Sequence, residues 1–313
     1  MSGGRRLLVL GPGEGWHADR LRSAAARRGD SLEFAAYESL AAALDPSCGH
    51  RASCERGWLG DFDVVLTRTM PPGTLEQITL RLSVLHAAVE EGLPVVNEPR
   101  ALEMAIDKYR TLARVAALGY PVPETRVVQS RREAMEAFSA LDRDVIVKPL
   151  FGGEGRGVMR VHDRELAWVT FSTLENLGAV LYVQRFVPPG GVDTRLLVIG
   201  EQVFAVRRTA AEGWKTNVAA GARCEKIEVE EWHRQLAQRI AGDMSLRIAA
   251  VDMIDSADGE PKILEVNAVP GWKGAEAALG IDVAEKILEA TEGHEKARKV
   301  GVCGLFNSEH RVH

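Results

Sequence analysis

Residues 145–161 read VIVKPLFGGEGRGVMRV, and the order of residue types in this stretch decides the expected fold. An apolar run ends in Lys148, glycines dominate residues 152–157, and a second apolar run begins at Val158. This pattern predicts a β-hairpin with a glycine-rich tip. Glycines let backbone N–H groups approach phosphate oxygens because no Cβ stands in the way, and the lysine adds positive charge. The stretch therefore predicts a phosphate-binding loop, with a flexible hairpin and a surface lysine as the alternative.

The spacing of these glycines excludes two other nucleotide motifs. It fits neither G-x-G-x-x-G nor G-x-x-x-x-G-K-[ST], so a Rossmann dinucleotide site and a P-loop are not expected. The loop residues that we expect at the phosphates are Gly153, Glu154, Gly155 and Gly157.

The chain before this hairpin has a different pattern. Apolar runs at residues 7–10, 63–67 and 94–97 are continuous, and helix-compatible segments at 17–28 and 74–91 lie between them. Continuous apolar strands that alternate with helices are typical of a parallel α/β sheet. We therefore expect an N-terminal parallel α/β domain over residues 1–97. A helix over residues 101–117 is expected to follow it.

The second part of the chain is expected to be α+β with antiparallel strands. Strands are predicted at 145–147, 158–161, 181–183, 195–199, 203–206, 249–255 and 262–266, and helices at 131–140, 165–177, 230–244 and 282–292. We expect this domain over residues 98–292, divided into subdomains at 98–183 and 184–292, with a polar tail at 293–313.

Composition excludes several classes of protein. The 313 residues are 46% hydrophobic and carry a net charge of −5, which argues against general binding to nucleic acid or a membrane surface. The four cysteines are too few for a disulfide framework, and no apolar stretch approaches the roughly 18 residues of a membrane span. We expect a reduced, cytoplasmic protein.

Oxygen-bearing side chains interrupt two apolar strands near the end of the second part. Residues 249–254 contain Asp252, and residues 262–267 contain Glu265 and Asn267 on one strand face. Paired as a hairpin, these strands would gather hard oxygen ligands of the kind that Mg²⁺ shares with substrate phosphates. The alternative is a buried ion pair between an acidic residue and an arginine.

Together, these motifs resemble the ATP-grasp superfamily, and the chain is most similar to its RimK-type amino-acid ligases. The resemblance covers residues 97–292 and implies the ATP-grasp fold. It implies that Lys108 and Lys148 contact the nucleotide. It also implies an adenine-binding hinge at Gln184, Arg185, Phe186 and Val187, an Asp-x-Arg motif at Asp193 and Arg195, and metal ligands at Asp252, Glu265 and Asn267.

The resemblance also implies catalytic roles for Arg207, Lys215 and Asn217, which fall where the family keeps groups for the acyl phosphate and the incoming amino acid. Two positions depart from the family pattern. Residues 218–221 lack an arginine that many relatives have, and Arg185 stands where an acidic residue is common. The missing arginine affects how the amino acid would be held.

The implied function is an ATP- and Mg²⁺-dependent (or Mn²⁺-dependent) carboxylate–amine ligase. It would activate an acceptor carboxylate as an acyl phosphate and join it to an amino acid, most simply L-glutamate. The acceptor would be a small molecule or a protein, with no nucleic acid or membrane partner, and a homo-oligomer is compatible with the sequence. The alternatives are a nucleotide-binding regulatory protein without turnover, a ligase for another amino acid, and a kinase-like enzyme that stops at the phosphorylated product.

Three further sequence features carry weaker hypotheses. Cys48 and Cys54 are expected in an exposed loop rather than a metal site. Arg68, which follows an expected parallel strand, would either reach substrate or form a structural ion pair. Trp272 would either touch substrate or pack in the core.

Overall fold

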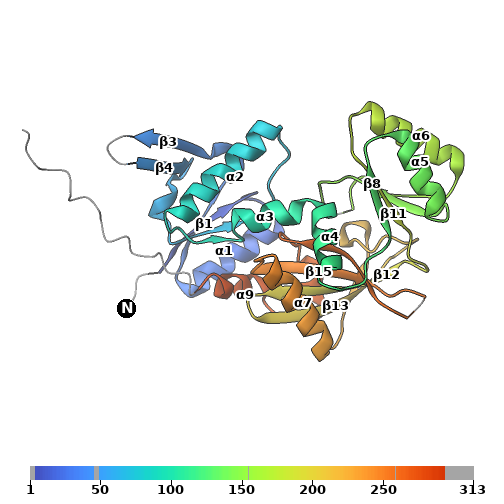
Figure 1. Cartoon of the computed structure of the whole chain (residues 1–313). Helices are drawn as coiled ribbons and strands as arrows, with labels where there is room; N and C mark the ends of the chain where they lie inside the picture. Colours follow the sequence, from blue (N-terminus) through green and yellow to red (C-terminus); the bar gives the residue numbers. More distant parts are fainter. Residues whose placement is uncertain (1–3, 46–48, 154, 258, 293–313) are drawn as a thin grey trace, which may run out of the picture. The chain divides into compact units, whose positions relative to one another are not determined.

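The computed structural model describes residues 4–45, 49–153, 155–257 and 259–292 (Figure 1). Its contacts divide the chain into two compact units. The first unit contains residues 4–13, 22–98 and 291–292, and the second contains residues 14–21 and 99–290. Within the described ranges, no helix is long and apolar enough to cross a membrane.

A parallel sheet forms the first unit, as the sequence predicts. Its strand order is β2 (Ser31–Ala35), β1 (Arg6–Leu10), β6 (Val64–Thr67) and β7 (Val95–Val96), and every pairing is parallel. Helix α1 (Trp16–Arg28) follows β1, and helix α2 (Leu75–Glu90) follows β6. The α2 helix starts at a capping box in which Thr74 and Gln77 satisfy each other's backbone N–H groups.

A three-stranded antiparallel sheet also lies in the first unit, and the sequence analysis missed it. It consists of β3 (Ala41–Asp45), β4 (Gly49–Cys54) and β5 (Gly57–Trp58). The expected loop around Cys54 is therefore wrong, because Cys54 ends a strand and is buried. Few residues of these strands are β-branched or aromatic, so local propensity gives no signal and packing decides. Cys48 lies outside the described residues.

The second unit holds two antiparallel sheets. The first has the order β10 (Met159–Val161), β9 (Val145–Lys148), β11 (Leu181–Arg185) and β8 (Thr125–Val128). Helices α5 (Arg131–Ala140) and α6 (Arg164–Asn176) form an apolar core with one face of this sheet, which includes Val145, Val147, Leu181 and Val183. Alternate residues of the same strands therefore point away from the helices.

The other sheet has the order β14 (Arg223–Lys226), β13 (Gln202–Thr209), β12 (Val192–Ile199), β15 (Ile248–Ile254) and β16 (Lys262–Asn267). Helices α7 (Glu231–Asp243) and α9 (Val283–Ala290) contact β12, and α8 (Lys273–Leu279) contacts β14. Strand β14 and helix α8 were not predicted. Both are short, and glycines at 271 and 274 obscure the helical pattern of α8.

The single helix expected over residues 101–117 is two helices, α3 (Pro99–Ile106) and α4 (Lys108–Ala117). Asp107 separates them. Its backbone is extended (φ −90°, ψ 103°), and its carboxylate accepts a hydrogen bond from the backbone N–H of Arg110. This is an N-cap, and it makes Lys108 the first residue of α4.

Candidate active site

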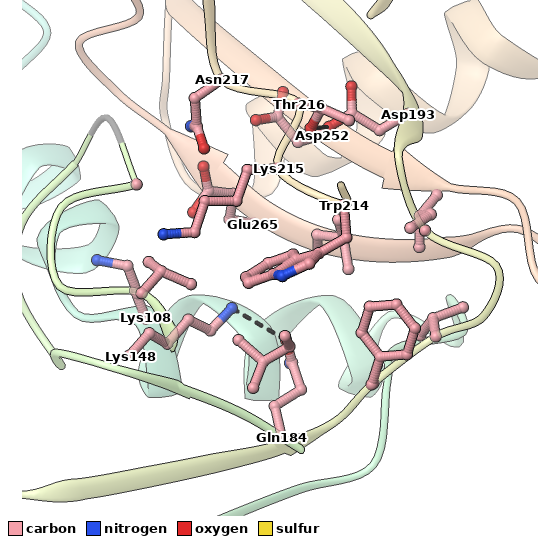
Figure 2. Close-up of a pocket in the computed structure, with 18 of the residues that line it drawn as sticks. Lys108, Lys148, Gln184, Asp193, Trp214, Lys215, Thr216, Asn217, Asp252 and Glu265 are labelled. Carbon is pink, nitrogen blue, oxygen red and sulfur yellow. Dashed lines mark hydrogen bonds between the residues drawn. The ribbon is translucent and has the colours of Figure 1, made fainter. Parts of the chain in front are cut away.

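A cavity in the second unit is lined by side chains from both of its sheets (Figure 2). Figure 2 shows Lys108 and Lys148 on one side of it, with Glu265 and Asn217 across from them. The lining contains most of the residues that the sequence analysis selected: Lys108, Lys148, Gly153, Gly155, Gln184, Arg185, Phe186, Val187, Asp193, Lys215, Asn217, Asp252 and Glu265. Glu154 lies outside the described residues, and Gly157 and Asn267 are not part of the cavity lining.

Lys148 ends strand β9 and is buried on the face opposite α5 and α6. Its Nζ donates a hydrogen bond to Gln184 Oε1 at 3.0 Å and lies 5.1 Å from the centroid of the Tyr182 ring. Burial lowers the pKa of Lys148 to about 8, while the carboxylate of Glu265 acts in the opposite direction. The lysine is therefore a desolvated cation directed into the cavity.

Lys108 is placed by the first turn of α4. Its ammonium donates to the carbonyl oxygen of Gly152, at the start of the glycine-rich loop. Burial lowers the pKa of Lys108, and the carboxylates of Glu265 and Asp107 oppose that shift. Glu265 therefore interacts electrostatically with both Lys108 and Lys148.

The glycine-rich loop joins β9 and β10 as the predicted hairpin does, and it lines the cavity. Gly155 has a φ of +71°, which disfavours any other residue type. A Cβ built on Gly155 would also lie 2.8 Å from Cγ of Asn217, so the backbone of the loop packs directly on that side chain. Both constraints require glycine at this position.

Two backbone amides of the expected hinge form hydrogen bonds within the protein. The N–H of Arg185 donates to the carbonyl of Glu124 at 2.8 Å, and the N–H of Phe186 donates to the carbonyl of Asp144 at 2.9 Å. These two amides are therefore already bonded to protein. The Arg185 side chain forms ion pairs with Glu124 and Asp142.

Two aromatic side chains lie beside the hinge. The rings of Phe186 and Trp214 meet edge to face with centroids 6.2 Å apart, and both residues line the cavity. Flat apolar rings of this kind suit a planar base. The sequence analysis assigned no role to Trp214.

A buried arginine–aspartate network borders the cavity on the side opposite Lys148 and Gln184 (Figure 2). Asp252 accepts bonds from Arg195 Nε at 2.7 Å and Arg195 Nη2 at 2.6 Å, and Arg208 Nη2 lies 3.0 Å from its Oδ2. Arg208 also bonds both oxygens of Asp193, at 2.7 and 2.6 Å. We call Asp193, Arg195, Arg208 and Asp252 the buried network.

The buried network changes the interpretation of Asp252. Burial would raise the pKa of this carboxyl, but the guanidinium groups of Arg195 and Arg208 hold it well below its usual range. The arginine ion pair that the sequence analysis kept as an alternative is therefore present at Asp252. Arg195 is engaged in the same pair and does not line the cavity.

Glu265 and Asn267 remain as the oxygen donors of strand β16. Asn267 Nδ2 donates to Glu265 Oε1 at 3.0 Å, and Glu265 lies opposite Asp252 in the β15–β16 pair. Over the described residues, no group of three or more His, Cys, Asp or Glu side chains forms a metal cluster. One or two carboxylates completed by phosphate oxygens are nevertheless typical of protein-bound Mg²⁺. Glu265 with the amide oxygen of Asn267 fits that pattern.

Arg207 does not line the cavity, whereas Arg208 does. Both lie on β13, where alternate side chains point to opposite faces, and Arg207 is exposed while Arg208 is buried. The position chosen from the sequence is therefore one residue away from the arginine that the strand directs inward. The facing Asp193 is the signal that would have indicated Arg208.

Two hypotheses remain, which concern Trp272 and Arg68. Trp272 is a core residue, 1% exposed, and its ring packs on His17 with centroids 4.5 Å apart. Arg68 is buried in the first unit, where its carbonyl accepts a bond from the Tyr37 hydroxyl at 3.1 Å.

Residues 105–291 match the family model of the RimK-like ATP-grasp domain. The chain belongs to the RimK-like ATP-grasp family. It is 31% identical to a tetrahydromethanopterin:alpha-L-glutamate ligase of Methanosarcina acetivorans, over 74% of this chain and 80% of that protein. It is 32% identical to a probable alpha-L-glutamate ligase of Legionella pneumophila, over 87% and 86% of the two chains.

Solved structures show the same fold. A RimK domain ATP-grasp protein of Sphaerobacter thermophilus matches with a TM-score of 0.66 and 25% identity, over 92% of this chain and all of that chain. The ATP-grasp ligase PsnB, complexed with a minimal precursor, matches with a TM-score of 0.72 and 24% identity, over 93% and 99% of the chains. The expected ATP-grasp fold is confirmed, and the RimK-like protein is an ATP-dependent carboxylate–amine ligase.

Proposed function

We propose that this RimK-like ligase activates an acceptor carboxylate as an acyl phosphate and joins it to the amine of L-glutamate, using ATP and Mg²⁺. One observation carries the proposal: the cavity unites the buried Lys148, the half-buried Lys108 and a glycine-rich loop with a carboxylate that interacts with both lysines. ATP would bring the negative charge that this arrangement accommodates.

The chemistry divides into two balanced steps. An oxygen of the acceptor carboxylate attacks the γ-phosphorus, the bond from that phosphorus to the β–γ bridging oxygen breaks, and ADP leaves. The amine nitrogen then attacks the acyl carbon, the bond from that carbon to the phosphate oxygen breaks, and phosphate leaves while the amine gives up a proton. Both steps join anionic or developing anionic groups, so positioned cations lower their barriers.

We assign Lys108 and Lys148 to the phosphates of ATP, with the loop at Gly153, Gly155 and Gly157 covering them. Glu265 and Asn267 would hold Mg²⁺, which supplies positive charge to the phosphate oxygens when bound. Asp252 would act mainly by holding Arg195 and Arg208, because those arginines already bond its oxygens. Closure of the loop on Asn217 would exclude water from the acyl phosphate.

The choice of glutamate is supported by relatives that are named alpha-L-glutamate ligases. Lys215 and Asn217 line the cavity and are the groups that we assign to the incoming amino acid and the acyl phosphate. A second candidate is a ligase for another amino acid. Residues 218–221 favour it, because they read VAAG and provide no guanidinium for the side-chain carboxylate of glutamate.

The test is a coupled assay with product masses. The protein is incubated with ATP, Mg²⁺, each amino acid in turn, and a panel of pterin, peptide and protein-tail carboxylates. We expect acceptor-dependent ADP release and a product heavier than the acceptor by one glutamyl residue. A product of another mass selects the second candidate, and a phosphorylated end product selects a kinase-like enzyme.

Hydroxylamine provides an independent test of the first step. It replaces the amine and converts an acyl phosphate into a hydroxamate, so the acceptor is trapped even without the correct amino acid. ATP binding without ADP release or hydroxamate from any acceptor would contradict the proposal and support a nucleotide-binding regulatory protein.

A further inference from the structure

We propose that Thr125, which lies outside the cavity lining, is a positioning residue that acts through Gln184 on Lys148. The inference rests on the ATP site proposed above. Thr125 is the first residue of β8, a strand that the sequence analysis did not predict.

Three neighbouring strands place these residues on one face of their sheet. Thr125 lies directly opposite Gln184 in the β8–β11 pair. Lys148 lies opposite Tyr182, two residues before Gln184, in the β9–β11 pair. Because alternate residues of a strand share a face, all of these side chains project to the same side.

Hydrogen bonds connect the three polar side chains in a line. Gln184 Nε2 donates to Thr125 Oγ1 at 2.9 Å, and Lys148 Nζ donates to Gln184 Oε1 at 3.0 Å. Figure 2 marks the second of these bonds at the base of the cavity. Thr125 thus reaches the lysine through hydrogen bonds with Gln184, and the Tyr182 hydroxyl is a second neighbour of Thr125.

The carbonyl group of Pro123 determines which groups donate and which accept in this series of hydrogen bonds. Thr125 Oγ1 lies 2.8 Å from Pro123 O, and a carbonyl oxygen can only accept, so the hydroxyl proton of Thr125 points to it. The hydroxyl oxygen then offers only lone pairs to Gln184. The amide must therefore turn its NH₂ toward Thr125 and its oxygen toward the lysine.

This orientation is the one that suits Lys148. An ammonium group has three donors and no acceptor, so a reversed amide would set NH₂ against NH₃⁺. Lys148 and Gln184 are only 7% and 2% exposed, so little water reaches them to relieve such a conflict.

The other groups around Lys148 do not provide this constraint. Glu265 attracts its ammonium, Lys108 repels it, and the ring of Tyr182 lies against it. Gln184 in its set orientation gives the ammonium a fixed acceptor before ATP binds. A lysine ordered in advance loses less freedom when the nucleotide arrives.

The experiment compares Thr125→Val, which cannot accept a hydrogen bond, with Thr125→Ser, which can. We expect Thr125→Val to weaken ATP binding by about tenfold, and Thr125→Ser to bind like the wild type. The KM for ATP should rise in parallel, while kcat stays within about threefold, because the change affects binding. Thr173→Val is the matched control, since it removes a threonine–carbonyl bond of 2.9 Å on α6, away from the cavity.

A double-variant cycle identifies the route. If Thr125 acts through Gln184, adding Thr125→Val to Gln184→Leu should cause no further loss of ATP affinity. Additive losses would overturn the inference, as would wild-type affinity in Thr125→Val. Should Thr125→Val fail to fold in a thermal melt, Thr125→Ala removes the same acceptor with a smaller side chain. Failure of the wild type to bind ATP would instead overturn the nucleotide site itself.

Discussion

Gly155 of the glycine-rich loop packs on the side chain of Asn217, with no room for a Cβ between them. The contact joins the loop that would cover the phosphates to the segment that we assign to the amino acid. Loop closure and amino-acid binding therefore share one contact surface.

Gly155→Ala should disrupt this contact. The added methyl group meets Asn217, and the φ of +71° is strained for alanine, so the loop cannot close as before. We expect kcat for ligation to fall by at least about tenfold, and ADP release to exceed amide formation because water gains access. Measuring ADP and product in the same reaction tests this.

Gly153→Ala is the control for the contact with Asn217, because a Cβ at Gly153 would meet nothing within 4 Å. Gly153 is itself assigned to the phosphates, so the comparison uses the ratio of ADP to amide product and not the absolute rate. In Gly153→Ala, the amounts of ADP and amide product should remain equal. Equal behaviour of the two variants would show that the contact with Asn217 has no part in closure.

Arg208 and Arg207 are neighbours on strand β13, and variants of the two provide a test and its control. Arg208→Ala leaves Asp193 and Asp252 buried without their shared partner, which should lower the free energy of unfolding by about 3–5 kcal/mol. Arg207→Ala removes an exposed side chain and should change it by less than about 0.5 kcal/mol. Urea unfolding of both variants checks the difference, and equal stabilities would contradict the buried network.

Titration of Lys148 should make the free energy of unfolding depend on pH in the alkaline range. Its pKa is about 8 in the folded protein, whereas the ordinary pKa of a lysine is 10.5, so the unfolded chain binds the proton more tightly between those values. Stability therefore rises with pH across this window, because folding no longer has to bury a charge. Relative to Lys148→Met, the wild type should gain about 2 kcal/mol between pH 8 and pH 10 in urea unfolding.

A constant stability difference between the two proteins across that range would contradict the burial of a titrating lysine.

The same titration predicts a kinetic effect of opposite direction. The kcat/KM for ATP should fall above pH 8, because the free enzyme loses the ammonium that meets the phosphates.

Glu265→Gln tests the metal site. Removing the carboxylate should raise the Mg²⁺ concentration needed for half-maximal ATP binding by at least about tenfold. Glu201→Gln, at the exposed turn between β12 and β13, should leave it unchanged. An unchanged Mg²⁺ requirement in Glu265→Gln would place the metal elsewhere. Mn²⁺ can be titrated in the same way.

Much of the fold follows from the sequence because the deciding patterns are local. Continuous apolar runs indicate the buried parallel strands, and the glycine-rich hairpin between β9 and β10 occurs where it was predicted. The break between α3 and α4 was missed, although Asp107 is a good N-cap residue, because the apolar periodicity continues across it.

The residue types of the site could be predicted from the sequence, but their hydrogen-bond and ion-pair partners could not. Lysines, glycines and acidic residues stand out in the chain, whereas the partners of Asp252 depend on strand register. Arg195 lies opposite Asp252 because β12 pairs with β15, and no local pattern specifies that pairing. Thr125 was missed for the same reason, since its role depends on the strand that lies beside it.

The buried network contains two arginines and two aspartates, so its formal charges cancel. This side of the cavity therefore presents little net field to an incoming polyanion. Attraction must come from the lysines that line the cavity and from the metal, and the charges of Lys108 and Lys215 are partly exposed to solvent. Nucleotide capture should accordingly respond to ionic strength, while the framework that holds the site in shape should not.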